Sequence, residues 1–411
     1  MTRTGKHTLA MLAALIVVAG NAPTVSAQDE RGYLFPNTPL GIDFNGWISN
    51  GYTYNSDEPP SRYNGPMSFN DRDDEWQLNQ LYFVMQREID TSENMIDIGG
   101  RMDFIYGTDS RFTKAVGLEL NQDGTPGLNA GQRFYQMAFP QFYTELGIGD
   151  LSIKAGHFYT IIGYETVTAP DNFFYSHAYT MQYGEPFTHT GVLTSLALTD
   201  NLTLMNGIHL GWDIFNVNNT APAFANRGSY LGGVNMAMMD GLVNLAVTGT
   251  AGNELDASGV NYQSRTLISV VATTQLTDNI QSVIQSDIGR QLGGSGVTPG
   301  RNAEWYGVNS YLFMQLTDTV KGGLRCEWFR DDDGARVAGV GNGNPSGVGG
   351  FAGDFYEVSA GVNWSPLGNL IVRPEMRWDW YDPAAGIAAR PFNDGMRGGM
   401  FTSAVDAILL W

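Results

Sequence analysis

The spacing of the strands that the sequence predicts constrains its fold more than any other feature. Alternation of apolar and polar residues between turn-forming residues predicts sixteen strands, at 44–55, 76–89, 94–107, 135–148, 151–160, 188–199, 202–213, 230–239, 242–252, 265–277, 280–291, 304–317, 319–331, 354–365, 369–381 and 401–411. Seven connections between them are tight turns, at 91–93, 149–150, 199–201, 240–241, 277–279, 317–318 and 366–368. The other eight are long, at 56–75, 108–134, 161–187, 214–229, 253–264, 292–303, 332–353 and 382–400. Short and long connections alternate without exception, which predicts an antiparallel sheet with all its long loops at one end.

The C-terminal residues predict a strand that closes this sheet on itself. Phe401, Val405 and Leu409 share one face with the terminal Trp411, and Asp406 lies on the other face. An amphipathic last strand that ends on an aromatic residue is typical of a β-barrel whose last strand pairs with its first. We therefore expect a closed barrel.

The N-terminal residues predict an export signal. A positive stretch with Arg3 and Lys6 precedes an apolar run at 9–19, which is too short to span a bilayer as a helix. Small residues up to Ala27 suit a signal peptidase. The predicted organisation is a cleaved signal peptide at 1–27, a short periplasmic lead segment at 28–43 and a transmembrane β-barrel at 44–411.

The two faces of the predicted strands indicate a barrel that crosses a membrane. In 369–381, Met376 and Trp380 share an apolar face, while Arg373 and Arg377 share the opposite one. A charged face opposed to an apolar face is expected where the interior of a barrel is wet and its exterior meets lipid. The fold class is therefore all-β, a transmembrane antiparallel up-and-down β-barrel of about 16 strands, within a range of 14–18. The single cysteine, Cys326, has outward parity and is expected to face lipid.

Tryptophans fall near both ends of the predicted strands. They form two candidate aromatic girdles, with Trp212, Trp328 and Trp380 at the external ends and Trp364 and Trp411 at the periplasmic ends. The alternative is that aromatic residues simply favour strands.

The charge of the chain excludes one class of partner. Only 16% of residues are charged, and the net charge is −19. Removal of the signal peptide takes away two positive charges, so the mature chain reaches −21. This balance argues against nucleic acid as a partner and favours cations near the molecule.

Four segments carry a resemblance to a known family. They are 156–165, 169–177, 325–334 and 373–379. With them the chain resembles, over residues 44–411, the putative β-barrel porin-2 (OmpL-like) family, which is abundant in planctomycetes and their relatives. The resemblance implies a barrel in the bacterial outer membrane with a pore function, and it implies no defined catalytic site and no known solute.

The connection at 161–187 is the main candidate for a functional element. It carries seven aromatic rings, more than a solvent-exposed loop normally shows. We expect it to fold into the lumen as a constriction, as the corresponding loop does in general porins. The alternative is an external loop packed on its neighbours or on another subunit. The predicted constriction sets three acidic loop residues against five basic strand residues, namely Glu165, Asp171 and Glu185 against Arg101, Lys154, Arg325, Arg373 and Arg377.

Other candidate sites are weaker. Two acidic clusters at the ends of long loops are weak metal candidates, at Asp71, Asp73, Asp74, Asp331, Asp332 and Asp333. Neither has the spacing of a calcium-binding loop, and most charge runs are solvated faces. No Gly-x-Ser-x-Gly elbow and no convincing Ser–His pair occurs, so we predict neither an enzyme nor a cofactor.

The predicted function is an outer-membrane porin through which small hydrophilic solutes or ions diffuse passively. Its lumen is expected to be filled with water and narrowed by 161–187. Two alternatives stay open, a channel specific for a substrate such as a sugar and a plugged structural or adhesive barrel. The expected partners are outer-membrane lipid and small hydrophilic solutes, and the size is compatible with a homotrimer.

Overall fold

The computed structural model describes residues 41–121, 127–128, 134–215, 228–255, 262–298, 300–337 and 350–411. The predicted signal peptide and most of the predicted lead segment lie outside these residues. The described part of the chain contains no helix that is both long enough and apolar enough to cross a membrane.

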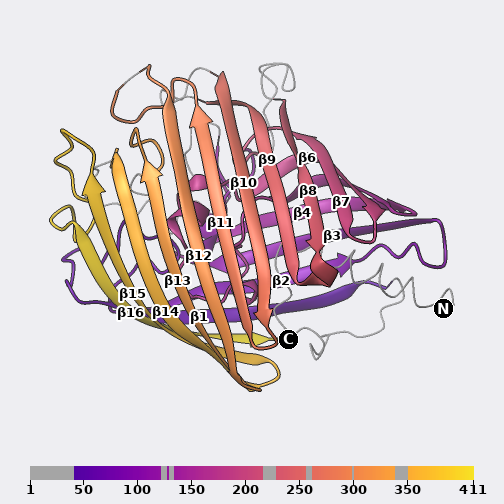
Figure 1. Cartoon of the computed structure of the whole chain (residues 1–411), viewed down its shortest axis with the longest axis horizontal. Helices are drawn as coiled ribbons and strands as arrows, with labels where there is room; N and C mark the ends of the chain where they lie inside the picture. Colours follow the sequence, from indigo (N-terminus) through magenta and orange to yellow (C-terminus); the bar gives the residue numbers. More distant parts are fainter. Residues whose placement is uncertain are drawn as a thin grey trace.

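The described residues form sixteen antiparallel strands in one closed barrel (Figure 1). The strands are β1 (Asp43–Asn55), β2 (Glu75–Arg87), β3 (Ile96–Gly107), β4 (Gln136–Ile148), β5 (Leu151–Tyr159), β6 (Thr188–Thr199), β7 (Leu202–His209), β8 (Ser229–Met238), β9 (Val243–Leu255), β10 (Tyr262–Thr277), β11 (Ile280–Gln291), β12 (Ala303–Thr317), β13 (Val320–Asp331), β14 (Gly353–Leu367), β15 (Leu370–Pro383) and β16 (Gly399–Leu410). Each strand pairs with its neighbours in sequence, and β1 pairs with β16. The predicted fold class is therefore confirmed.

Four short helical turns lie in the described parts of the connections. They are η1 (Asp109–Arg111), η2 (Ala169–Asp171), the π-helical turn η3 (Thr180–Gly184) and η4 (Met239–Gly241). Both η2 and η3 belong to the connection between β5 and β6, and η3 packs against β11 and β12. Figure 1 shows the C-terminus at the end of the barrel where β10 turns into β11, one of the short connections.

The strands separate polar and apolar side chains as predicted. On β15, Arg377 is 1% exposed whereas Met376, the preceding residue, is 53% exposed. Trp378 and Trp380 share the exposed parity of Met376. The charged positions therefore face the interior, and the apolar positions form the outer wall. Cys326 also lies on the exposed face of its strand.

The predicted strands agree with the structure to within four residues at each end, and two differences have a physical reason. Strand β7 ends at His209 instead of continuing to residue 213, because the chain turns inward at Gly211, which has φ +123°. Strand β2 alternates irregularly because its pairing with β1 shifts between Ser49 and Asn50. A bulge of this kind places two successive residues, Asn79 and Gln80, in the interior.

Candidate functional site

The connection at 161–187, hereafter the 161–187 loop, crosses the interior of the barrel. The Tyr164 N–H donates to the side chain of Gln285 on β11 at 3.2 Å, and Gln80 on β2 donates to the carbonyl of Val167 at 2.7 Å. Six strands separate β2 from β11 around one side of the ring and eight around the other. No residue of the loop is exposed, so the loop lies inside the barrel and fills part of its section.

Three arginines of the inner wall hold the carbonyl groups of the loop. Arg325 on β13 donates to the carbonyl of Ser176 at 2.8 Å. Arg377 on β15 donates to the carbonyl of His177 at 2.6 Å, and Arg373 on the same strand donates to two further loop carbonyls at 2.8 and 2.6 Å. The three arginines therefore contact the loop directly and do not face it across an open gap.

Two glutamates of the same wall hold N–H groups of the loop. Glu375 on β15 accepts from the backbone of Tyr175 at 2.9 Å and of Ser176 at 3.0 Å. Glu327 on β13 accepts from the backbone of Thr180 at 2.7 Å and also from its hydroxyl. A buried segment outside a helix or sheet must find partners for its backbone groups, and this wall supplies both donors and acceptors. The loop is fastened by its backbone, which fixes its position.

Glu165, the first predicted acidic residue, is neutralised inside the protein. Its carboxylate pairs with Arg325 at 2.7 Å and lies 3.3 Å from the imidazole of His177. Burial alone would raise the pKa of Glu165, but Arg325 and His177 outweigh burial and lower the pKa to about 2. Arg325 also pairs with Glu357 on β14.

The other two predicted acidic residues differ in exposure. Asp171 is partly exposed, and its carboxylate accepts the Thr168 hydroxyl at 2.6 Å. Glu185 is buried and accepts from the amide of Gln285 on β11. Asp171 is therefore the only one of the three acidic residues whose side chain reaches solvent-accessible space in the described structure.

The two remaining predicted cations lie on β3 and β5, which flank β4 in the barrel wall. Arg101 on β3 pairs with Asp103 at 2.6 Å, and it is partly exposed. Lys154 on β5 is also partly exposed, and its ammonium lies 4.3 Å from the centre of the Tyr143 ring. In the part of the chain that the structure describes, no hydrogen bond or ion pair joins either cation to the 161–187 loop.

The rings of the loop pack on the inner wall. Tyr164 lies 4.9 Å from Tyr311 on β12, and Phe173 lies 4.8 Å from Phe313 on the same strand, measured between ring centres. The ring of Phe174 lies under the guanidinium of Arg325 at 4.8 Å. This packing accounts for a loop that is rich in aromatic residues and yet exposes no large apolar side chain.

The carboxylates of the first acidic cluster already bind donor groups of the protein. Asp71 pairs with Arg111 at 2.7 Å, Asp73 accepts the backbone N–H of Asn55 at 2.7 Å, and the carboxylate of Asp74 accepts the hydroxyl of a tyrosine. Across the described ranges, no group of three or more His, Cys, Asp or Glu side chains converges in a way that could hold a metal ion. The metal role of this cluster stays a prediction without structural support.

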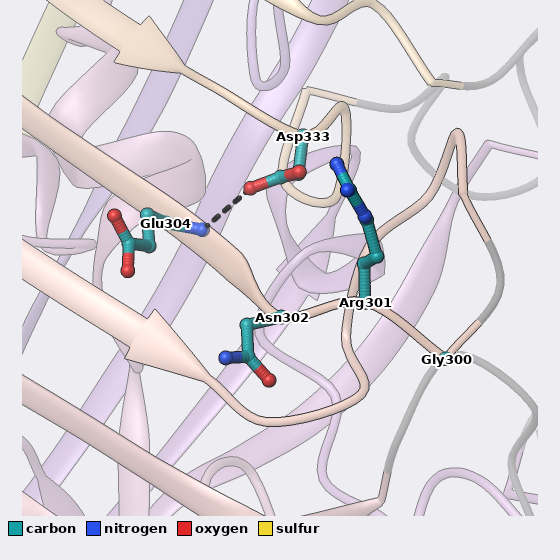
Figure 2. Close-up of a pocket in the computed structure, with 5 residues that line it drawn as sticks. All are labelled: Gly300, Arg301, Asn302, Glu304 and Asp333. Carbon is teal, nitrogen blue, oxygen red and sulfur yellow. Dashed lines mark hydrogen bonds between the residues drawn. The ribbon is translucent and has the colours of Figure 1, made fainter.

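The second cluster caps a strand end. Asp331 accepts three backbone N–H groups of the following loop at 2.8–2.9 Å, and Asp332 pairs with Arg330 at 2.6 Å. Asp333 accepts the backbone N–H of Glu304 at 3.1 Å (Figure 2). These acceptors are used to fix the loop between β13 and β14.

Asp333 also lines an open pocket of about 350 Å³ between two of the long loops. Figure 2 shows the other lining residues, Gly300, Arg301, Asn302 and Glu304. The pocket carries charges of both signs, from Arg301 and from Glu304 and Asp333. The carboxylate of Asp333 already accepts a backbone N–H. The pocket is a depression where two loops meet, and the arrangement selects no ligand.

One of the predicted girdle residues is not on the outer surface. Trp212 follows the end of β7, is 7% exposed and packs edge-on against the inward Trp305, with ring centres 6.2 Å apart. The guanidinium of Arg265 lies over its ring at 4.6 Å. The prediction failed because it extended β7 beyond the inward turn at Gly211.

The other predicted girdle residues have outward parity. Trp364 and Trp380 are exposed, Trp328 donates to the carboxylate of Asp354 at 2.8 Å, and Trp411 is partly exposed. Their position at the ends of strands is compatible with the predicted girdles.

The residues that sequence reasoning missed are the acidic partners on the inner wall. They are Glu327, Glu357, Glu375, Asp379, Asp406 and Asp287, all buried. A signal was present, because most of them share the inward parity of the predicted arginines on the same or a neighbouring strand. Charged residues of both signs at inward positions indicate ion pairs inside the barrel, which weakens any prediction of free arginines in a pore.

Comparison with known families and structures gives a consistent picture. The family model described as "Putative beta-barrel porin-2, OmpL-like" matches residues 41–410. A search of curated proteins found no match.

Several solved structures share the fold at low sequence identity. The outer membrane channel DcaP of Acinetobacter baumannii is 11% identical with a TM-score of 0.56, over 91% of this chain and 99% of that one. An anion-selective porin from Comamonas acidovorans is 8% identical with a TM-score of 0.57, over 90% and 99%. OmpT of Vibrio cholerae is 10% identical with a TM-score of 0.54, over 92% and 100%. At these identities the likeness concerns the fold alone.

Proposed function

Because this chain belongs to the putative beta-barrel porin-2, OmpL-like family, we propose that it is a porin of the bacterial outer membrane, through which small hydrophilic solutes or ions diffuse passively. The closed barrel of sixteen strands with an apolar outer wall supports this location. The proposed function is transport and includes no catalytic step.

The observation that carries the proposal is the 161–187 loop. It crosses the lumen between β2 and β11, and its backbone is fastened to β13 and β15. A fixed obstacle inside a barrel narrows the aqueous path and sets the size limit of a solute. In this proposal the loop is a permanent constriction and not a mobile lid.

The proposed passage has charges of both signs at its border. Asp171 on the loop is one partly exposed acid, and Arg101 and Lys154 on the wall are partly exposed cations. Charges of opposite sign in a narrow wet passage create a field across it and a preference for one sign of ion. Glu165 and Glu185 contribute less than the sequence suggested, since both are buried and bonded.

The test is single-channel conductance of the purified mature chain in a planar bilayer, under a KCl gradient. Discrete current steps with a reversal potential that favours K⁺ support the proposed pore and its acidic border. Steps with a reversal potential that favours Cl⁻ retain the pore and assign the selectivity to Arg101 and Lys154. Absence of steps from a folded and inserted barrel contradicts the proposal.

A plugged structural barrel is the second candidate, and one observation favours it. No residue of the 161–187 loop is exposed, and its rings pack tightly on the wall, so the loop fills much of the barrel. This candidate predicts no conductance in the same experiment. Stacking of a sugar on the rings of the loop is disfavoured, because the rings are covered by other side chains.

Three further proposals concern the assembly and the source of the protein. Cleavage of a signal peptide after Ala27 is testable by N-terminal sequencing of the protein from the membrane. A homotrimer is supported by the fold it shares with OmpT of Vibrio cholerae, which has been solved in a trimer form, and native mass spectrometry tests it. An origin among planctomycetes rests on the resemblance alone.

A further inference from the structure

Two acidic side chains meet inside the barrel where the 161–187 loop returns to the wall. They are Glu185 of the loop, which is 5% exposed, and Asp287 of β11, which is 0% exposed. Both carboxyl groups accept from the same side-chain nitrogen, that of Gln285 on β11, so they lie next to each other. Such a contact between two acids is unfavourable when both are ionised.

The side chain of Gln285 fixes the position of both acids. Its amide oxygen accepts the backbone N–H of Tyr164 at 3.2 Å, so its NH₂ group must point the other way. That NH₂ group donates to the Glu185 carboxylate and, at 2.9 Å, to Oδ1 of Asp287. Ser269 on β10 donates to the same Oδ1 at 2.7 Å. The second oxygen, Oδ2 of Asp287, is buried and has no hydrogen-bond partner.

The groups around the pair provide no compensating positive charge. Glu165 of the loop adds a negative charge that acts on Glu185, and it is itself paired with Arg325 on β13. The phenols of Tyr164 and, on β12, Tyr311 stand near Glu165 and are neutral. Among the described residues, no Lys, Arg or His side chain lies within 4 Å of either carboxyl group. The described surroundings therefore contain no cation next to the pair that would balance two negative charges.

The fit of the loop brings the acids together. Gly163 has φ +89°, and a Cβ at this position would lie 2.1 Å from a carboxylate oxygen of Glu185. A glycine at 163 is therefore required for Glu185 to reach the wall. Burial and the neighbouring Asp287 both raise the pKa of Glu185 well above its usual value, in agreement with the geometry.

We propose that Glu185 and Asp287 share one proton at neutral pH, and that this shared proton fastens the end of the 161–187 loop to β11. The proton occupies the contact between the two carboxyl groups and provides the partner that Oδ2 of Asp287 otherwise lacks. The pair behaves as one titrating unit, with a first proton lost at low pH and a second lost at a pH well above the usual pKa of a glutamate.

The direction of the pH effect follows from the shared proton. A carboxyl group held protonated in the folded state stabilises that state at low and neutral pH, and the contribution is lost as the pH rises through the raised pKa. Above that pH two adjacent negative charges repel each other inside the barrel. The end of the loop then separates from β11, while the arginines and glutamates of β13 and β15 still hold its middle.

The test that does not depend on transport is infrared spectroscopy of the folded protein at neutral pH. The difference spectrum between wild type and Glu185→Gln is expected to contain the absorption of a protonated carboxyl group. Asp287→Asn is a second variant with the same expected loss. Asp278→Asn is the matched control, because Asp278 lies exposed in the short turn between β10 and β11, so its difference spectrum should lack that absorption.

A difference spectrum without the protonated carboxyl in both variants would overturn the proposal, since the pair would then be doubly ionised.

Conductance provides the second test, and this part rests on the proposed porin function. Wild type and Asp278→Asn should change their conductance between neutral and alkaline pH, whereas Glu185→Gln should not. If no channel opens in any variant while the infrared result holds, the porin function fails and the shared proton stands. Equal pH dependence in Glu185→Gln and wild type would contradict the role of the pair in the loop.

Discussion

Trp411 and Gly46 exchange two backbone hydrogen bonds, each with an N–O distance of 3.0 Å, where the last strand meets the first. The indole of Trp411 lies over Gly46, since a Cβ at Gly46 would stand 2.9 Å from it, and its ring centre is 5.7 Å from that of Phe83 on β2. The terminal residue therefore contacts two strands beyond its own.

Deletion of Trp411 is expected to impair assembly of the barrel. The deletion removes both hydrogen bonds and the ring contact at the seam, which leaves an open edge at the end of the barrel that carries the short turns. The fraction of protein that resists denaturation by SDS without heating measures assembly. Trp411→Phe is the control and should assemble nearly as well as wild type. Equal assembly of the deletion variant and the control would show that the terminal residue is dispensable.

Replacement of Arg325 by Met should destabilise the protein and loosen the 161–187 loop. The change takes the arginine away from buried Glu165 and leaves Glu357 with only the more distant Arg377, at 3.7 Å, and loss of one partner in a buried ion pair costs about 3–5 kcal/mol. Urea unfolding in lipid bilayers measures the loss. Arg290→Gln breaks an exposed pair with Glu304 and should cost less than about 1 kcal/mol. Similar losses in the two variants would contradict the anchoring role of Arg325.

Replacement of Met376 by Arg should destabilise insertion. Met376 is on the outer face of β15, and an arginine that faces lipid costs about 2–4 kcal/mol at the middle of the bilayer. Met376→Leu keeps an apolar side chain and serves as control. Unchanged folding of the arginine variant in bilayers would refute the outward orientation of this position.

Replacement of Asp171 by Asn should lower the preference for cations. Asp171 is the partly exposed acid of the loop, whereas Glu165 and Glu185 are buried. A variant that neutralises all three acids should therefore shift the reversal potential about as far as Asp171→Asn alone. Lys154→Gln, on β5, should shift it the other way. A reversal potential that is the same in wild type and Asp171→Asn would remove Asp171 from the passage.

The ion pair between Glu165 and Arg325 should persist in acid. The pKa of Glu165 is lowered to about 2, so its stabilising effect is complete above the usual value for a glutamate and is lost only as the pH falls through about 2. Urea unfolding of wild type and Glu165→Gln should therefore differ at pH 7 and also near pH 3. Convergence of the two stabilities well above the usual pKa of glutamate would show that the pair is weaker than its geometry indicates.

The architecture could be predicted because it rests on local patterns. Turn chemistry and the period of two placed the strands to within a few residues, and the inward parity of Arg373 and Arg377 was correct. The inward course of the 161–187 loop was expected from its rings. The strands, the inward side chains and the course of the loop follow from residues close together in sequence, or from the contrast between the polar interior of the barrel and its apolar outer wall.

The partners of the charged residues could not be predicted in the same way. Glu165 meets Arg325, and Glu185 meets Asp287, only because the loop crosses the barrel at a particular height. Contacts of this type join residues more than 100 positions apart, and no periodicity encodes them. Trp212 was misplaced for a related reason, since its orientation follows from one inward turn at Gly211.

The 161–187 loop touches both sides of the seam at which the barrel closes. The seam lies between β1 and β16. Gln80 on β2 donates to the loop on one side of the seam, and Arg373 on β15 donates to it on the other side. The loop is therefore an inner brace across the joint between the two ends of the chain. The loop that narrows the path of a solute also connects the two sides of this seam. Its removal would therefore weaken the barrel mechanically and change its selectivity.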